Sequence, residues 1–128
     1  MKVVQELVAY FDRRGKLSPA QLRALLDHGY LAADAPPNLL ELSAQVRDTF
    51  YFRVMGASEG PLWGTDVYTG DSAIAVAAVH AGLVSAGGSA VLRVVAVAPP
   101  PQFSGSVRNG VTSHDFGRYG SAYQLSAV

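Results

Sequence analysis

The sequence predicts an α+β fold, in which one central helix packs against antiparallel β-sheets and a short helical region precedes them. Three observations lead to this prediction. The 128-residue chain changes composition near residue 49, an almost wholly apolar segment over residues 73–81 has the length of a short helix, and strand-like segments occur on both sides of it. Residues 1–48 contain two of the 13 glycines, and residues 49–128 contain the others. We therefore divide the chain into a helical N-terminal adaptor region, residues 1–48, and a second domain, residues 49–128.

The N-terminal region is predicted to form two short amphipathic helices and a third, weaker one. Apolar residues recur at helical spacing over residues 2–13, and Gly15 ends this helix. Ser18 and Pro19 begin a second helix as N-cap and first helical residue, and a weaker segment follows over residues 39–46. Two helices joined by a turn also suggest a helix-turn-helix DNA-binding domain. We disfavour this interpretation, because the second helix offers few side chains to read bases and carries an aspartate that would face phosphate.

The second domain combines strands, turns and one buried helix. Phe50, Phe52 and Val54 alternate with Tyr51 and Arg53, which predicts a half-buried strand. A turn leads into a strand over residues 61–68, and a helix follows over residues 73–81, with Asp71-Ser72 as its N-cap and Gly82 as its glycine stop. A central strand is predicted over residues 90–98, a turn at Asn109-Gly110 and a last strand over residues 121–128.

Composition and charge exclude several classes of function. Lys+Arg and Asp+Glu both number 10, so the chain lacks the basic excess that nucleic-acid binders usually carry. The chain has no cysteine, which excludes a disulfide scaffold and a thiolate metal site. No segment approaches the roughly 18 apolar residues of a membrane span, and the N-terminus does not have the pattern of a signal peptide. We expect no cofactor, no metal, no nucleic-acid partner and no membrane span, and a cytoplasmic location, or an extracellular one if a signal was removed.

The histidines do not indicate catalysis. We interpret His80 as structural, because a histidine near a helix C-terminus suits the helix dipole and its ring can bond a nearby backbone carbonyl. A metal-binding His80 would need partners, and neither His28 nor His114 is at ligand spacing to it. His114 and Asp115 with a nearby serine suggest a hydrolase, but the Gly-x-Ser-x-Gly pattern of a nucleophile elbow does not occur. We therefore predict no catalytic residues.

Two sets of residues are assigned roles. The structural set contains turn, cap and helix-end residues: Asp66, Ser72, His80 and Gly82. The predicted ligand surface combines aromatic rings with polar side chains on loops, and consists of Trp63, Tyr68, Arg108, Asn109, Arg118 and Tyr119. Aromatic faces stack on the C–H surfaces of sugars, while arginine and asparagine bond hydroxyls or phosphate. A place in the core is the alternative interpretation for Trp63 and Tyr68.

Three segments resemble the LCCL domain family: "LWGTDVYTGDSAIAVAAVHAGLV" at 62–84, "GGSAVLRV" at 87–94 and "FSGSVRNGVTSHDFGRYGSAYQL" at 103–125. The resemblance covers about residues 50–128, in the family's order and spacing, and does not extend over residues 1–48. It implies a central helix wrapped by small β-sheets. It also implies a non-catalytic module, proposed in the family to bind lipopolysaccharide, carbohydrate or other partners. The family has no well-established ligand-binding residues that could be carried over.

The absence of cysteine departs from the family's pattern. The family is widely extracellular and usually carries disulfides, and one family cysteine follows the Ser-x-Ile at the helix start, where this chain has Ala75. The chain resembles cysteine-free members that look bacterial. We predict a non-enzymatic binding module that recognises a protein, glycan or anionic lipid, with a protein partner or self-association favoured and lipopolysaccharide among the other ligands. The alternatives are a structural protein that forms homo-oligomers and an enzyme acting on a glycan or small metabolite.

Overall fold

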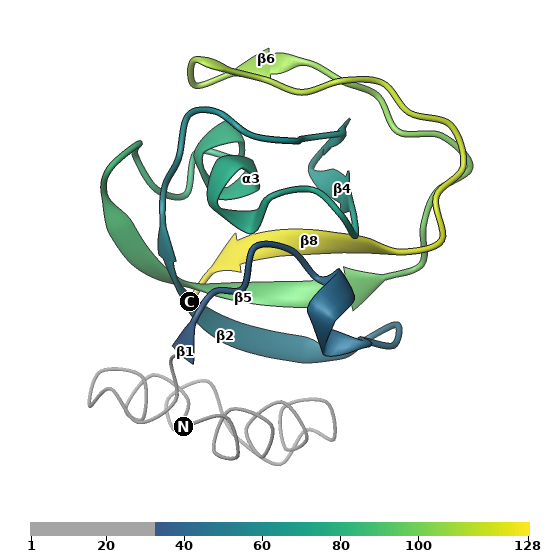
Figure 1. The fold of residues 1–128 in the computed structure, drawn as a ribbon, viewed down its shortest axis with the longest axis horizontal. Coiled ribbons are helices and arrows are strands. Elements are labelled where there is room, and N and C mark those ends of the chain that lie inside the picture. The colour runs from purple at the N-terminus through teal and green to yellow at the C-terminus, as the bar shows by residue number, and fades with distance from the viewer. Residues whose placement is uncertain (1–32) are drawn as a thin grey trace.

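A six-stranded sheet, a two-stranded hairpin and one short helix make up the part of the chain that the computed structural model describes, residues 33–128 (Figure 1). The helices predicted over residues 2–13 and 18–28 lie outside the described residues. The elements in chain order are β1 (Ala33–Asp34), the 3-10 turn η1 (Leu40–Leu42), β2 (Thr49–Met55), β3 (Gly64–Thr65), β4 (Val67–Thr69), α3 (Ile74–His80), β5 (Ser89–Val97), β6 (Val107–Arg108), β7 (Val111–Thr112) and β8 (Ala122–Ala127). This confirms an α+β architecture for these residues.

The sheet has the strand order β1-β2-β5-β8-β4-β3, with β5 in its middle. Strand β5 pairs along its length with β2 and with β8, so the prediction of a central strand is confirmed. All neighbouring pairs are antiparallel except β1 and β2, which run parallel. The expectation of purely antiparallel sheets was therefore wrong at this edge. Residues 35–48 form a crossover that returns the chain to the start of β2, and such a connection lets two strands pair in parallel.

The helix α3 lies at the centre of the domain, between the sheet and the segment that carries the β6–β7 hairpin (Figure 1). All of its residues except Ala75 are buried. Ile74, Val76 and Val79 join a core that includes Leu92 and Tyr123 from the sheet. Ala77 and Ala78 are also fully buried, and their small side chains allow the neighbouring strands to approach the helix closely. The predicted buried helix is confirmed, although it is shorter than residues 73–81.

The start of α3 differs from the prediction, whereas its end agrees. Ser72 is not the N-cap: Ala73 occupies that position without a side-chain bond. Backbone carbonyls from two loops accept the first amides of the helix in place of a side-chain cap. The Pro61 carbonyl accepts the amide of Ala73, and the Pro37 carbonyl accepts the amide of Ile74. The Oγ of Ser72 instead accepts the backbone N–H of Trp63 at 3.0 Å. The expected glycine stop is confirmed, since Gly82 follows the C-cap residue with φ 78°.

Three local predictions need correction. The weak helix over residues 39–46 is a single 3-10 turn, ended by Ser43 at φ 48°, although Leu39 joins the core. The strand over residues 61–68 is two strands, β3 and β4, because Asp66 adopts φ 67° between them. Tyr51, expected on the outer side of β2, is fully buried, and the Arg93 guanidinium on the paired strand lies 5.5 Å from the centre of its ring.

The turn at Asn109-Gly110 is confirmed. Asn109 has φ 52° and Gly110 has φ 76°, and the two residues close the hairpin between β6 and β7. Positive φ at both central positions is the mark of a type I′ turn, whose twist matches that of the flanking strands.

Candidate functional site

Two clusters of side chains include or adjoin residues of the β3–β4 hairpin, and they differ in exposure. The first, which we call the histidine network, consists of Thr65, Tyr68, His80 and Ser106 and is largely enclosed. The second, which we call the aromatic face, consists of Trp63, Phe116, Arg118 and Tyr119 and reaches the surface.

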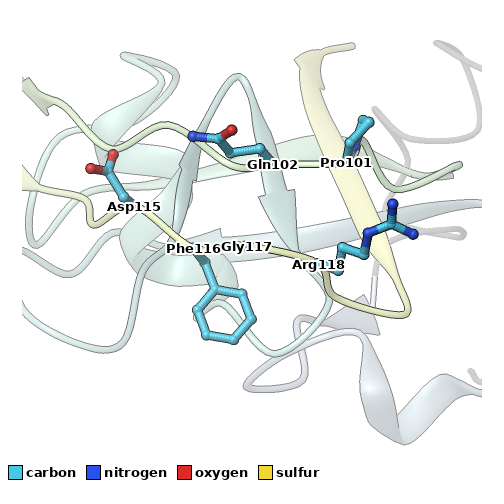
Figure 2. Close-up of a pocket in the computed structure, with 6 residues that line it drawn as sticks. All are labelled: Pro101, Gln102, Asp115, Phe116, Gly117 and Arg118. Carbon is cyan, nitrogen blue, oxygen red and sulfur yellow. The ribbon is translucent and has the colours of Figure 1, made fainter.

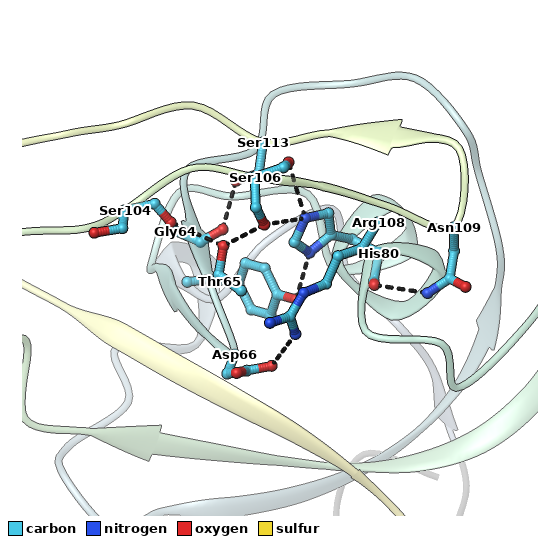
Figure 3. A network of polar contacts seen from close by, with 10 residues as sticks. Gly64, Thr65, Asp66, His80, Ser104, Ser106, Arg108, Asn109 and Ser113 are labelled. Carbon is cyan, nitrogen blue, oxygen red and sulfur yellow. Dashed lines mark hydrogen bonds and ion pairs between the residues drawn. The ribbon is translucent and has the colours of Figure 1, made fainter.

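His80 is the centre of the histidine network (Figure 3). Its side chain has no solvent exposure. The Tyr68 hydroxyl lies 2.8 Å from Nδ1, and the carbonyl oxygen and Oγ of Ser106 lie 3.2 Å and 3.1 Å from Nε2. Ser106 Oγ is 2.6 Å from Thr65 Oγ1, and the Thr65 hydroxyl donates to the Ser104 carbonyl at 2.8 Å. The network thus ties the end of α3 to β3, β4 and the start of the β6–β7 hairpin.

The acceptors at the ends of this network fix the direction of its protons. The Ser106 carbonyl can only accept, so Nε2 carries the imidazole hydrogen and Nδ1 is left as an acceptor. The Tyr68 hydroxyl donates to Nδ1, and it keeps its proton at neutral pH because burial raises the pKa of Tyr68 to about 12. Because Thr65 already donates to Ser104, the Ser106 hydroxyl donates to Thr65. Every hydroxyl and imidazole hydrogen of the histidine network therefore has an acceptor.

This arrangement does not suit nucleophilic catalysis. A serine nucleophile must donate its hydrogen to an unprotonated histidine nitrogen. Here the Ser106 hydroxyl points its hydrogen toward Thr65, and the adjacent Nε2 is itself a donor. The geometry therefore supports a structural role for His80, and its bond to the Ser106 carbonyl is of the kind expected from the sequence.

The β6–β7 hairpin is held down by two of the residues predicted to bind ligand. Asn109 donates through Nδ2 to the His80 carbonyl at 2.9 Å, which satisfies a carbonyl at the end of α3 (Figure 3). Arg108 Nη1 lies 2.9 Å from Asp66 Oδ1, although both side chains remain about half exposed or more. Ser113, which directly follows β7, donates to the Gly64 carbonyl. Arg108 and Asn109 thus attach the hairpin to the domain.

Replacing Asp66 with alanine tests whether its positive φ or its ion pair with Arg108 contributes more to stability. Asp66 sits at φ 67°, where alanine is disfavoured by about 1 kcal/mol, and it makes an exposed ion pair, which contributes little. We expect Asp66→Ala to lower the free energy of unfolding by about 1 kcal/mol in a urea titration. Asp66→Asn keeps the conformational preference and removes the charge, so it should cost less than about 0.5 kcal/mol. Equal losses for both variants would show that the ion pair, not the backbone, dominates.

The aromatic face is a row of three rings. Trp63 and Phe116 meet edge to face with centroids 6.2 Å apart, and Phe116 and Tyr119 do the same at 5.9 Å. Phe116 is 41% exposed, while Trp63 and Tyr119 are partly buried. Paired backbone bonds with Phe103, at 2.7 Å and 2.9 Å, hold Phe116 in place. The row is therefore built on hydrogen-bonded backbone, even though Phe116 belongs to no regular strand.

A shallow hollow of about 390 Å³ adjoins the row (Figure 2). It is lined by Pro101, Gln102, Asp115, Phe116, Gly117 and Arg118. In Figure 2, Gln102 and Asp115 lie toward one end and Arg118 toward the other. Asp115 already accepts the Gly105 amide at 2.7 Å, whereas Arg118 is exposed and makes no ion pair within residues 33–128. The hollow thus offers one available cation and hydrogen-bonding groups beside an aromatic ring.

Tyr119 connects the row to a carboxylate. Partial burial raises the pKa of the Tyr119 hydroxyl, and the negative charge of nearby Asp71 adds to the effect. Oδ1 of Asp71 is enclosed and has no hydrogen-bond partner among the described residues. The hydroxyl therefore stays protonated and remains a donor at neutral pH.

The predicted ligand residues divide into three groups. Trp63, Arg118 and Tyr119 come together on the aromatic face, while Arg108 and Asn109 attach the hairpin. Tyr68 is fully buried with its hydroxyl bonded to His80, so its assignment to a ligand surface was wrong. Sequence reasoning missed Phe116. Its signal was an aromatic residue two positions before Arg118 in a segment rich in glycine, but nothing local marked it as exposed.

Other kinds of site find no support in the described part of the chain. Between residues 33 and 128, no three His, Asp or Glu side chains come together in a way that could hold a metal ion. The helical segments in the same range are too short or too polar to cross a membrane.

The fold and the two clusters define a small α+β module, in which a buried helix and its histidine network lie beneath an exposed aromatic face. Residues 49–123 match the model of the LCCL domain family, and because this match spans more than half of the sequence, the chain belongs to that family. LCCL domains are generally non-catalytic modules. The chain is also similar to the human protein named "Cysteine-rich secretory protein LCCL domain-containing 2", with 39% identity over 70 residues. The similarity covers 53% of this chain and 14% of that relative, so the relative is a much longer protein that shares this one domain.

Proposed function

We propose that the chain is a recognition module that binds a saccharide on its aromatic face. The observation that carries the proposal is the exposed Phe116 ring beside the hollow, with Trp63 and Tyr119 on its two sides. Sugars present a C–H surface that packs on an aromatic ring and hydroxyls around their edge that need polar partners. Gln102 and Arg118 supply such partners at the rim of the hollow.

Charge extends the proposal from neutral to anionic saccharides. Arg118 is the cation of the hollow, and its guanidinium can bond a carboxylate, sulfate or phosphate on the sugar through two parallel N–H groups. Asp115 carries a negative charge and its Oδ1 accepts the Gly105 amide, but it lies toward the other end of the hollow, so an anion would bind at the Arg118 end (Figure 2). A phosphorylated or carboxylated saccharide should therefore bind more tightly than its neutral counterpart.

A glycan array probed with the intact chain tests this proposal. We expect Phe116→Ala to weaken binding of every bound saccharide about tenfold, because the stacking surface is lost. Arg118→Ala should weaken the anionic saccharides and leave neutral ones nearly unchanged. Titration calorimetry with the best array hit measures both effects.

The matched control is Gln124→Ala on β8, an exposed polar residue outside the aromatic face. It should leave every affinity unchanged. Binding that survives Phe116→Ala, or an array on which no saccharide binds, would contradict the proposal.

A protein partner or self-association is the second candidate. Two large apolar side chains are open to such a partner at separate places, since Val107 in β6 is 70% exposed and Met55 at the end of β2 is 69% exposed. Light scattering at high concentration, run on the same samples, shows whether copies of the chain associate. A strict monomer would remove the assembly alternative.

A further inference from the structure

A second hollow, of about 610 Å³, lies at the end of β2, away from the aromatic face. We call it the β2 groove. Its lining is mostly small or apolar, and includes Pro36, Pro37, Met55, Pro61, Ala75 and Val76. Val54 and Val76 at its base are essentially inaccessible to solvent, so the floor is part of the packed core. The groove is therefore a fixed depression with apolar walls.

The backbone at the rim of the groove is an open strand edge. Among residues 33–128, strand β1 pairs with β2 at Phe52 and Arg53, and its last bond runs from the Ala35 amide to the Arg53 carbonyl. Along β2, every second residue directs its backbone N–H and C=O groups to the same side. The Arg53 carbonyl faces β1, so the N–H and C=O groups of Met55, two residues further on, also face the β1 side. Pro36 and Pro37 follow Ala35 and lead the chain to α3, where the Pro37 carbonyl accepts the Ile74 amide. Met55 pairs with Ser89 of β5 on its other side, but on the β1 side it has no strand partner within residues 33–128.

The charges around the groove favour a basic ligand. Asp34 and Glu59 line the groove, with Arg53 as its cation. Asp34 and Arg53 lie 4.0 Å apart and offset one another. Glu59 is exposed and makes no ion pair with any residue that the structure describes, so it gives the rim a net negative charge. A ligand with a cationic side chain would complement it.

From these three features we propose that the β2 groove binds an extended peptide segment of a partner protein. The peptide adds to the edge of β2 at Met55 through main-chain hydrogen bonds. One of its apolar side chains enters the space over Ala75 and Val76, and a lysine or arginine side chain pairs with Glu59. The glycan proposal and this one concern different faces, so either can fail without the other.

The test uses a capped heptapeptide of alternating valine and lysine, added at about 1 mM to the isotope-labelled chain. We expect amide chemical-shift changes at Met55, Ala57, Ala75 and Ser89, with the amides of Phe116 and Arg118 unmoved. A peptide in which glutamate replaces lysine should bind more weakly. A peptide with N-methyl groups on alternate residues should not bind, because it cannot form the strand hydrogen bonds.

Two variants of the chain complete the test. Glu59→Lys reverses an exposed charge without touching the core and should weaken the valine–lysine peptide about threefold or more. Ala75→Leu fills the groove and should abolish binding, with circular dichroism to check that it folds.

Three results would overturn the proposal. These are shifts confined to the aromatic face, equal binding of the N-methylated peptide, or a dimer in light scattering that the Ala75→Leu variant abolishes, which would place a second copy of the chain in the groove.

Discussion

Gly64→Ala is expected to be the most damaging single-methyl change in the domain, with a loss of about 4 kcal/mol in the free energy of unfolding. Gly64 has φ 101°, a conformation that side chains rarely adopt. An added Cβ would also collide with the Val67 carbonyl across the β3–β4 hairpin. The backbone of Gly64, which would carry the Cβ, and the carbonyl of Val67 are both fixed by strand pairing, so neither can move without opening the hairpin. Thermal and urea unfolding followed by circular dichroism measure the loss.

Gly110→Ala is the matched control for this prediction. Gly110 has φ 76°, but an added Cβ would meet no atom within 4 Å. Only the conformational penalty remains, so we expect a loss of about 1 kcal/mol. If the two variants are equally stable, the close approach of Val67 is not what requires a glycine at position 64.

His80→Ala is expected to lower the free energy of unfolding by a similar amount, about 4 kcal/mol. The change empties a fully buried position between α3 and the β6–β7 hairpin. It also removes the acceptor of the Tyr68 hydroxyl and the donor to the Ser106 carbonyl. A buried polar group left without a partner costs about 1–3 kcal/mol in addition to the cavity. Urea titration gives the size of the loss, and saccharide affinity of the folded fraction should not change.

Tyr68→Phe separates the hydrogen bond from the packing. It keeps the ring that meets His80 edge to face at 5.6 Å and removes only the hydroxyl. The expected loss is about 1–2 kcal/mol, because His80 Nδ1 loses its donor. A variant at His80 that unfolds no more easily than the parent would contradict a structural role for this histidine.

The sequence was informative wherever local chemistry decides the backbone. The turn at Asn109-Gly110 and the glycine stop at Gly82 both require positive φ, a property of the residues themselves. The run of β5, apolar except for Ser89 and Arg93, indicated a strand with a neighbour on each side, which is its position in the sheet. These features depend on residues that are adjacent in the chain, and they agree with the family match over residues 49–123.

The sequence was less informative wherever distant residues compete for the same group. Ser72 has the chemistry of an N-cap, yet its hydroxyl bonds Trp63, nine residues away, and its carbonyl accepts the Tyr123 hydroxyl. The helix could forgo that cap because two proline carbonyls reached its first amides. No pattern within a short window contains these competitors.

What the sequence determined by itself is the buried helix, the central strand and the glycine-dependent turns of residues 49–128, the family and the lack of cysteine chemistry. Only the tertiary structure decided which aromatic rings reach solvent, because burial depends on what packs against each face. Tyr68 and Phe116 are both aromatic residues in glycine-rich surroundings. Tyr68 is enclosed by His80 and Tyr123, whereas Phe116 is exposed to solvent beside Arg118. The same holds for the β2 groove, whose open edge exists because β1 ends two residues before Met55 in the pairing.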